Sequence, residues 1–572
     1  MMFTEDSRVK IPTILHLIRL GYDYLPLNQA VWNSDTNIFT NIFKASVSHI
    51  NPETEADDIK RLLEEITLLI DNEDLGEAFY EKLTARSGIR LIDFEDFSKN
   101  SFHVVTELTY KNGDDEFRPD ITLLINGMPL VFIEVKKPNN REGILAERER
   151  INKRFQNVKF RRFVNITQFM LFSNNMEYDD KDPEPVQGAF YASSSYHQPV
   201  FNYFREEEEL NLTTLLRKES DAAENRVLAD NNLQVIKHNE EFTSNKEPGR
   251  PTNRICTSLL SHERLAFMLQ YALVYVKEYS GIQKHIMRYP QLFATKAIER
   301  RLNERLKKGI IWHTQGSGKT ALTYYNVGFL THYFQRKEVI PKFYFIVDRL
   351  DLLNQAHREF SSRGLSVRTI NSREDFAREI KGTGVIGNLK GKPEITVVNI
   401  QKFKDDPDII PTRDYSIDIQ RIYFLDEVHR SYKPGGSFLA NLYQSDRDAI
   451  KIGLTGTPLI TEEKKSNKKA YSSKEVFGDY MHKYYYNASI ADGYTLRLIR
   501  EEIANNYKMK LQQALQDMKI VKGDIKSKQI YAHPRFVEPM LDYIITDFEK
   551  SRRIMGDVSI GAMVVCDSSE QA

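Results

Sequence analysis

The 572-residue sequence has only two cysteines and no long apolar run. Cys256 and Cys566 lie 310 positions apart, a spacing that fits neither a disulfide framework nor a zinc site and is typical of a reducing compartment. The N-terminal residues are polar and mixed in charge, unlike a signal peptide. No segment approaches the roughly 18 apolar residues of a membrane span. We therefore expect a cytoplasmic protein without a membrane partner.

The sequence also has no excess of charge of either sign, because 80 Lys and Arg balance 80 Asp and Glu. This balance excludes a net-basic nucleic-acid binder, although a local basic groove is still compatible with it. A hydrophobic content of 41% with 28% charged residues is ordinary for a globular protein and too apolar for disorder. At about 150 residues per domain, the length predicts three to four domains.

The best linker candidate is the polar segment 240–254, which contains two prolines and lacks periodicity. Before it, we expect an α/β domain over 1–245. After it, short apolar strands alternate with helices, which predicts a parallel sheet covered on both faces over 255–475. A further domain begins within 476–572 and ends on the strand-like GAMVVCDSS. Smaller expected elements are a helix over 57–83, strands over 102–108, 121–125 and 130–135, a helical stretch over 143–162, and loops over 179–188 and 461–474.

A phosphate-binding loop is predicted where TQGSGKT follows the apolar residues 309–312. Gly316, Ser317 and Gly318 allow the backbone to curl so that successive N–H groups point at phosphate oxygens. Lys319 places a charge on the β- and γ-phosphates, and the Thr320 hydroxyl binds Mg²⁺. The pattern therefore predicts ATP and Mg²⁺ as cofactors. The first glycine of the general motif is absent, and His313 stands in its place.

An acidic pair supports this assignment. Asp426 and Glu427 follow the apolar strand pattern 422–425, at the sheet edge where α/β proteins bind ligands. We expect Asp426 to hold Mg²⁺ and Glu427 to orient the attacking water. A third strand closes on Thr455-Gly456-Thr457-Pro458.

The order GSGKT, DEVH and LTGTP resembles motifs I, II and III of superfamily-two helicases and translocases, which have RecA-like domains. The resemblance implies that Gln291 reads adenine, and that Arg349 in VDRLDLLNQ and Gln401 in VNIQKF face the nucleic-acid backbone. It also identifies MVVCDSS with motif IV, at the beginning of a second RecA-like domain. The arginine finger of the family is not among the residues printed here, so the resemblance implies that half of the ATP site lies elsewhere.

A second acidic site is predicted in the N-terminal domain, where Asp120 precedes one strand and Glu134 and Lys136 end the next. Phosphodiester hydrolysis needs acidic oxygens for a metal and a cation near the nucleophilic water. We expect Asp120 and Glu134 to bind Mg²⁺ and Lys136 to position the water. Asp120 shares a face with Glu134 only if the two pair directly. A two-residue Asn-Gly turn would prevent this, so we predict a three-residue loop or a bulge.

The string RPDITLLINGMPLVFIEVKKP closely resembles the PD-(D/E)xK nuclease core of the R subunit of type I restriction–modification enzymes. The resemblance implies an ATP-driven double-stranded DNA translocase and Mg²⁺-dependent endonuclease that works with methylation (M) and specificity (S) subunits. It also suggests Gln156 as the family's glutamine, with Phe160 in place of the usual tyrosine. Glu77 and Glu107 are possible additional acids.

Basic residues that include Lys153 and Arg154 alternate with phenylalanines and are candidates for DNA contacts. The alternative is an amphipathic helix whose aromatic side chains lie in the core. Three other functions stay open. One is a type III-like restriction subunit or repair helicase–nuclease, which the nuclease-first order disfavours. Another is a DNA-remodelling ATPase whose N-terminal domain only binds DNA, and the last is a chain that is inactive in isolation.

Overall fold

The computed structural model describes residues 4–137, 143–177, 189–196, 199–370, 372, 375–376, 393–399, 419–427, 446, 448–458, 473–495, 508–510, 512–513, 515–517, 531–556, 561–566, 568–569 and 571–572. The chain divides into two compact units, Met1–Thr495 and Leu496–Ala572. The first unit holds two seven-stranded sheets and carries both predicted sites.

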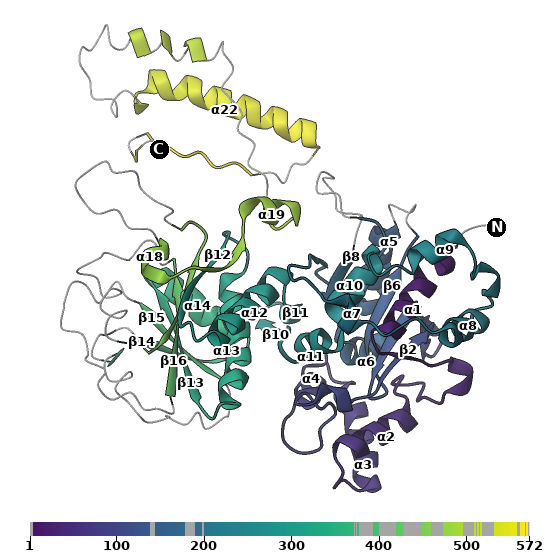
Figure 1. The fold of residues 1–572 in the computed structure, drawn as a ribbon. Helices are drawn as coiled ribbons and strands as arrows, with labels where there is room; N and C mark the ends of the chain where they lie inside the picture. Colours follow the sequence, from purple (N-terminus) through teal and green to yellow (C-terminus); the bar gives the residue numbers. More distant parts are fainter. Residues whose placement is uncertain are drawn as a thin grey trace. The chain divides into compact units, whose positions relative to one another are not determined.

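The N-terminal sheet is mixed and has the strand order β1-β2-β5-β6-β7-β8-β9 (Figure 1). Its strands are β1 (Asp23–Tyr24), β2 (Phe102–Thr106), β5 (Ile121–Ile125), β6 (Met128–Val135), β7 (Phe169–Ser173), β8 (Ala189–Ser193) and β9 (Asn202–Tyr203). Strands β5 and β6 are buried along their whole length, because helices and neighbouring strands cover both faces. A separate small hairpin pairs β3 (Tyr110–Asn112) with β4 (Asp115–Phe117).

Helices surround this sheet: α1 (Ile11–Arg19), α2 (Thr40–Ile50), α3 (Ala56–Leu69), α4 (Glu77–Leu83), α5 (Gly143–Gln156), α6 (Arg161–Ile166), α7 (Leu212–Leu215) and α8 (Asp221–Asp230). The single helix expected over 57–83 is wrong, because it is interrupted between α3 and α4. Leu75 and Gly76 there adopt positive φ angles of 55° and 81°, which a right-handed helix cannot contain.

The hairpin between β5 and β6 contains the bulge that the sequence predicted. Ile121 pairs with Ile133 and Leu123 with Val131, but Leu124 pairs with Pro129, so Leu130 is an extra residue on β6. The turn itself is the two-residue Asn126-Gly127, with φ angles of 51° and 77°. The bulge restores the register in which residues 120 and 134 fall on the same face.

The expected linker over 240–254 is wrong. It forms α9 (Glu240–Asn245) and the start of α10 (Pro251–Leu260). Pro251 occupies the first turn of α10, where a proline costs no hydrogen bond. Ile255, Cys256 and Leu259 are buried in one core cluster with residues of α1. Next come α11 (His262–Tyr271) and a hairpin of β10 (Leu273–Glu278) and β11 (Gly281–Ile286).

The second sheet is parallel throughout, as the alternating sequence pattern predicted, with strand order β14-β15-β13-β16-β17-β12-β18. Its strands are β12 (Lys308–His313), β13 (Ile340–Val347), β14 (Ser366–Ile370), β15 (Glu394–Asn399), β16 (Ile419–Asp426), β17 (Ile450–Thr455) and β18 (Tyr480–Tyr484). The described helices around it are α12 (Tyr289–Asn303), α13 (Lys319–Gln335), α14 (Leu350–Ser362), α18 (Ser473–Phe477) and α19 (Tyr486–Ala491). Strand β18 lies beyond the expected domain boundary at residue 475.

In the second unit, α22 (Pro534–Met555) is the longest described element. Residues 561–566, where we expected a strand, are not in one. The beginning of a second RecA-like domain therefore stays a prediction. The loop expected over 179–188 lies outside the described residues, as does nearly all of that expected over 461–474. Across the parts of the chain that are described, no helix is both long and apolar enough to cross a membrane.

Candidate active sites

The three residues predicted for DNA cleavage lie together at the end of the β5–β6 ribbon. The backbone N–H of Val135 donates a hydrogen bond of 2.9 Å to Oδ2 of Asp120. The Lys136 ammonium lies 3.6 Å from Oδ2 of Asp120 and 3.8 Å from Oε2 of Glu134. The bulge in β6 places Asp120 and Glu134 on the same face of adjacent strands, where the side chains of opposed residues are close together.

Two further carboxylates that the sequence did not single out lie against Lys136. Oε2 of Glu147 on α5 is 3.6 Å from Nζ, and Oε1 of Glu5 is 3.8 Å from it. The Glu147 side chain is only 2% exposed and is also paired with Arg150 at 2.9 Å. A signal was present in the sequence, because Glu147 precedes the buried Ile151 by four positions and so lies on the apolar stripe of α5.

Of the two acids proposed as additional ligands, Glu107 lies beside Asp120, whose backbone carbonyl accepts from the Glu107 N–H at 3.2 Å, but the carboxylates of both are paired with lysines. Glu77 is paired with Lys277 at 2.9 Å, and Glu107 with Lys10 at 2.8 Å. The side chain of Gln156 is exposed, and Phe160 is buried in an apolar cluster.

The electrostatics of this group differ from those of surface carboxylates. Burial, together with the nearby Asp120 and Glu147, raises the pKa of Glu134 well above its usual value. Burial lowers the pKa of Lys136, but the surrounding carboxylates outweigh it and raise that pKa above the ordinary value. Lys136 therefore stays protonated, while Glu134 binds a proton more readily than an exposed glutamate does.

These residues fit Mg²⁺. Oε1 of Glu134 is buried and has no hydrogen-bond partner, which is costly unless a ligand completes it. Mg²⁺ takes oxygen ligands and is usually held by one or two carboxylates while it keeps several waters. Within the described ranges, no group of three or more His, Cys, Asp or Glu side chains is arranged for a metal. A site with Asp120 and Glu134 as its two acids suits Mg²⁺ better than zinc.

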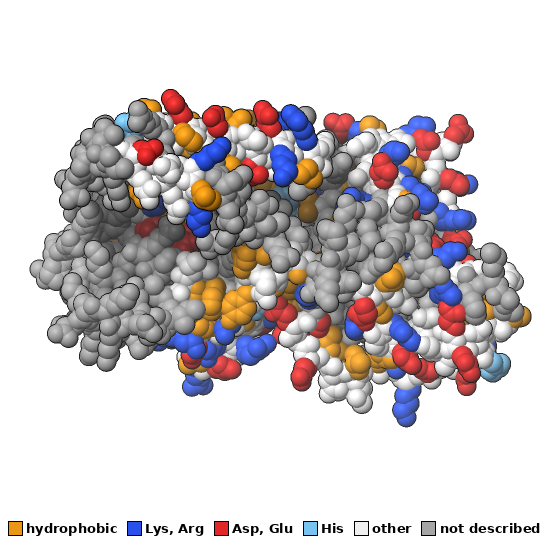
Figure 2. Space-filling model, turned by 90° about the horizontal axis from the view of Figure 1, so that it is seen from above, with side chains coloured by type: hydrophobic (Ala, Val, Ile, Leu, Met, Phe, Trp, Pro, Cys, Tyr) orange, Lys and Arg blue, Asp and Glu red, His pale blue; other side chains and the backbone are white. Residues whose placement is uncertain are grey.

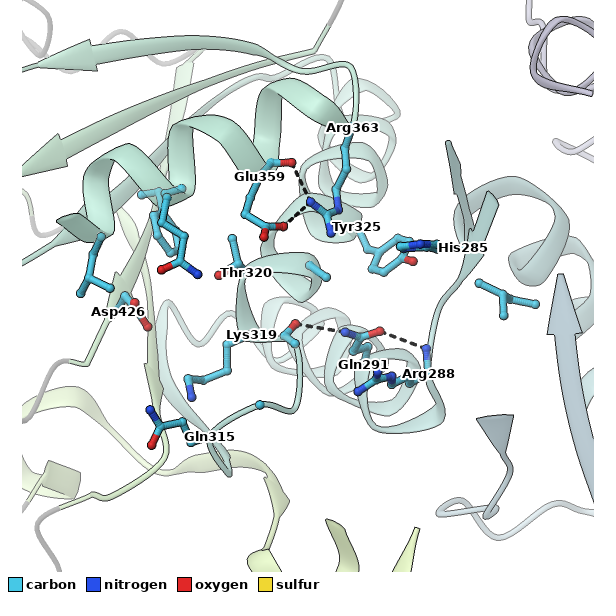
Figure 3. A pocket seen from close by; sticks show the side chains of 18 of the residues that line it. His285, Arg288, Gln291, Gln315, Lys319, Thr320, Tyr325, Glu359, Arg363 and Asp426 are labelled. Atoms are coloured by element: carbon cyan, nitrogen blue, oxygen red, sulfur yellow. Dashed lines mark hydrogen bonds and ion pairs between the residues drawn. The ribbon is translucent and has the colours of Figure 1, made fainter. Parts of the chain in front are cut away.

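The second site lies at the carboxyl ends of β12, β17 and β16, which are neighbours in the parallel sheet. A cavity of about 580 Å³ opens there, lined by Gln291, Lys319, Thr320, Asp426 and Glu427. In Figure 3, Asp426 lies at one end of this cavity and Arg288 and His285 at the other, with Thr320 and Lys319 between them. The motifs that the sequence separates by more than 100 residues thus share one cavity.

The phosphate loop has the backbone that its glycines permit. Gly316 and Gly318 have φ angles of 80° and 82°, and α13 begins directly after Gly318. A Cβ atom at Gly318 would lie 2.5 Å from Nε2 of Gln291, so a side chain there would displace the Gln291 amide, and the positive φ also disfavours any residue but glycine. The helix start therefore presents free N–H groups and its positive dipole end to an anion.

Three side chains that the sequence singled out lie around the loop. The Lys319 ammonium is 3.8 Å from Oε1 of Glu427. Burial and the neighbouring Glu427 raise the pKa of Asp426 to about 6, and perturbed pKa values of this kind cluster at functional sites. Gln291 donates to the carbonyl of Gly318 at 3.0 Å and accepts from the backbone N–H of Arg288 at 3.0 Å. The donor set of Thr320 and Asp426 oxygens fits Mg²⁺.

The candidates for DNA contact are more dispersed. Arg349 is exposed, lines the nucleotide cavity and is paired with Asp351 at 2.7 Å. Lys153 is exposed, and the Arg154 guanidinium packs 4.2 Å above the Phe117 ring. Gln401 lies outside the described residues. On the face shown in Figure 2, basic and acidic side chains are interspersed among the coloured residues.

The phenylalanines of this basic stretch, Phe155, Phe160 and Phe163, are buried in one cluster. Their burial agrees with the alternative that places the aromatic side chains in the core, but they lie in α5, a short 3-10 turn and α6 rather than in one helix. Only the basic side chains are left for DNA.

Comparison with known proteins assigns both halves of the chain. Residues 2–179 match the family described as type I restriction enzyme R protein N terminus. Residues 2–179 thus resemble the N-terminal domain of type I restriction enzyme R proteins. Residues 290–530 match the SWI2/SNF2 ATPase family. The expected α/β fold class, a restriction-nuclease domain followed by a superfamily-two helicase domain, is thus confirmed.

Curated proteins similar to this chain are named in the same way. The endonuclease subunit of the type I restriction enzyme SauCOLORF180P from Staphylococcus aureus (strain COL) is 26% identical, over 97% of this chain and 53% of its own length. A Methanocaldococcus jannaschii relative, provisionally named the MjaVIIIP endonuclease subunit of a type I restriction enzyme, is 28% identical over 72% of this chain and 36% of its own length. The chain therefore spans about a third to a half of these relatives.

Solved structures resemble the chain only weakly. A fragment assigned to an HsdR subunit of a type I restriction enzyme from Vibrio vulnificus YJ016 is 13% identical, covers 78% of this chain and 69% of that chain, and has a TM-score of 0.26. The type ISP restriction-modification enzyme LlaBIII bound to DNA is 12% identical, covers 44% of this chain and 19% of that chain, and has a TM-score of 0.29. Scores this low support no argument about this chain.

Proposed function

We propose that this chain is part of the ATP-dependent DNA translocase and Mg²⁺-dependent endonuclease subunit of a type I restriction–modification enzyme. The observation that carries the proposal is the presence of two separate groups of reactive side chains on two sheets. One group is Asp120, Glu134 and Lys136, and the other lines the cavity around Lys319.

At the nuclease site, Asp120 and Glu134 would hold the metal, which would supply Lewis acidity and lower the pKa of bound water. Lys136 stays positively charged, because the carboxylates around it raise its pKa. Its ammonium can orient the attacking water and offset the charge of the scissile phosphate. The low exposure of Glu134, 4%, strengthens these interactions because less water screens them.

At the motor site, the backbone of Gly316, Ser317 and Gly318 cradles the phosphates, and Lys319 neutralises the β- and γ-phosphates. Thr320 and Asp426 would hold the Mg²⁺ that binds with ATP. Glu427 orients the attacking water, and Gln291 reads the adenine amine. The chain uses these residues to bind and align ATP before charge develops on the γ-phosphate.

Double-stranded DNA and the M and S subunits are the proposed partners. A motor that moves along any sequence is expected to contact mainly the DNA backbone. Arg349 and Gln401 are proposed for such contacts in the motor, and Lys153 and Arg154 near the nuclease site. Target recognition belongs to the S subunit in this proposal.

Two substitutions in the assembled enzyme test the separation of roles. Asp120→Ala should abolish DNA cleavage and leave DNA-stimulated ATP hydrolysis intact. Lys319→Ala should abolish ATP hydrolysis and translocation. Loss of ATP hydrolysis in Asp120→Ala would show that the two sites are not separate.

The match to SWI2/SNF2 ATPases favours a second candidate, a DNA-remodelling ATPase whose N-terminal domain binds DNA without cutting it. Nicking of plasmid DNA in the presence of Mg²⁺ distinguishes the two. Nicking that disappears in Glu134→Ala supports the endonuclease, whereas no nicking by the unmodified enzyme supports remodelling.

A further inference from the structure

A line of hydrogen bonds runs from the protein surface to the end of the phosphate-loop strand. Nε2 of His313, the last residue of β12, lies 2.7 Å from Nδ1 of His482 on β18. Nε2 of His482 lies 2.6 Å from Oε2 of Glu207. Glu207 belongs to the segment that follows β9, so it comes from the N-terminal half of the chain.

The direction of the protons follows from the carboxylate. Glu207 can only accept, so a neutral His482 donates to it from Nε2 and has Nδ1 as its acceptor. Nε2 of His313 must then donate to His482. Nδ1 of His313 is left without a proton, and it is a buried atom with no hydrogen-bond partner. Burial, with His482 and Lys319 nearby, lowers the pKa of His313 well below its ordinary value and keeps this ring neutral.

The inner end of this line touches the phosphate loop. His313 replaces the first glycine of the general motif, and its carbonyl accepts a hydrogen bond from the Lys319 ammonium at 3.5 Å. The next residue, Thr314, is tied to β18 by a 3.1 Å hydrogen bond from its N–H to the carbonyl of Tyr484. The position of the His313 ring therefore affects where Lys319 rests.

The outer end is anchored on both sides of Glu207. Arg205 is paired with the buried Asp492 at 2.9 Å. Glu208 is paired with Arg264 at 3.0 Å and with Arg300 at 3.1 Å. These anchors hold Glu207 against His482 with little freedom to move away.

We propose that Glu207 is a positioning residue for the ATP site, acting through His482 and His313 to place Lys319 at the β- and γ-phosphates. The inference rests on the proposed ATP-binding function. It gives the segment after β9, which lies outside the phosphate-loop motif, a role in nucleotide binding. Without the acceptor at Glu207, His482 can turn to another tautomer, and the His313 ring loses its fixed partner.

The test compares Glu207→Ala with Glu209→Ala in the full chain. Glu209 is exposed on the same segment and serves as the matched control. Binding of fluorescent ATP and ADP analogues is measured together with the thermal unfolding midpoint. Glu207→Ala should weaken ATP binding about tenfold, the effect of losing one hydrogen bond to a charged group. ADP binding should weaken less, because it lacks the γ-phosphate.

Two additional variants separate positioning from general damage. Glu207→Gln keeps an acceptor oxygen and should recover most of the ATP affinity. His482→Ala should reproduce the Glu207→Ala defect, and the double variant should be no worse than either alone. The inference would be overturned if Glu207→Ala lost ATP and ADP affinity equally. It would also be overturned if Glu207→Ala and Glu209→Ala bound ATP equally well. Either result would leave the proposed ATP-binding function intact. Failure of the unmodified chain to bind ATP would overturn the proposed function as well.

Discussion

Asp426→Asn should make the motor domain more stable while weakening its Mg²⁺-dependent binding of ATP. The reason is the raised pKa of Asp426, which burial and Glu427 move from 3.8 to about 6. When the pKa of a carboxyl is higher in the folded than in the unfolded protein, its ionised form destabilises the folded protein at pH values above the folded-state pKa. The cost disappears as the pH falls below the unfolded value.

The size of the stability change follows from the same shift in the pKa of Asp426. A change of about two pKa units corresponds to about 3 kcal/mol at pH 8, where Asp426 is charged in both states. At pH 5 the folded carboxyl is mostly protonated, and the cost falls to about 1.6 kcal/mol. Asp426→Asn removes the charge, so its stabilising effect should be about 1.4 kcal/mol larger at pH 8 than at pH 5.

Tryptophan fluorescence provides the assay. The chain has two tryptophans, and in a Trp32→Phe background only Trp312, in β12, reports on unfolding of the motor sheet. Urea unfolding without nucleotide or Mg²⁺ is compared at pH 5 and pH 8, with the exposed Asp351→Asn as control. A gain in stability that is the same at both pH values, or a loss at pH 8, would refute the reasoning.

Three other substitutions test the geometry. Gly127→Ala should lower the free energy of unfolding by more than about 2 kcal/mol, because φ is 77° and a Cβ would lie 2.7 Å from the Phe39 carbonyl oxygen. Urea titration compares this variant with Gly113→Ala, because Gly113 has a positive φ but open space around it. An equal loss of unfolding free energy in the two variants would contradict the prediction. Gly318→Ala should abolish ATP-analogue binding, and removing the opposing Gln291 amide should recover part of it; a variant that binds normally would disprove the close packing. Glu147→Gln should move the acid limb of the DNA-cleavage profile to lower pH, because Glu147 contributes to the raised pKa of Glu134, and an unchanged profile would count against that coupling.

The nuclease hairpin shows how far sequence reasoning reaches. The chemistry required Asp120 and Glu134 on one face, and the Asn-Gly turn alone would have separated them. A bulge was the remaining solution, and β6 has one at Leu130. The motor motifs were equally accessible, because the carboxyl ends of parallel strands meet at one sheet edge.

Other features depend on contacts that no local pattern encodes. Glu5 and Glu147 come from helices on either side of the site in sequence, and only tertiary packing brings them to Lys136. The polarity of segment 240–254 suggested a linker, but the apolar residues that bury α10 begin only at Ile255. The partnership of His313 with His482 spans 169 positions and has no sequence signature.

The burial of α10 bears on where this chain can be divided into fragments. A cut at residue 245 would look reasonable from composition and would leave both sheets complete. It would also strip Cys256, Leu259 and Leu260, each 0% exposed, from the core that they share with α1. An isolated nuclease fragment that ends there would expose a normally buried apolar surface to solvent and would tend to aggregate. Fragments that extend through α11 are the ones to express.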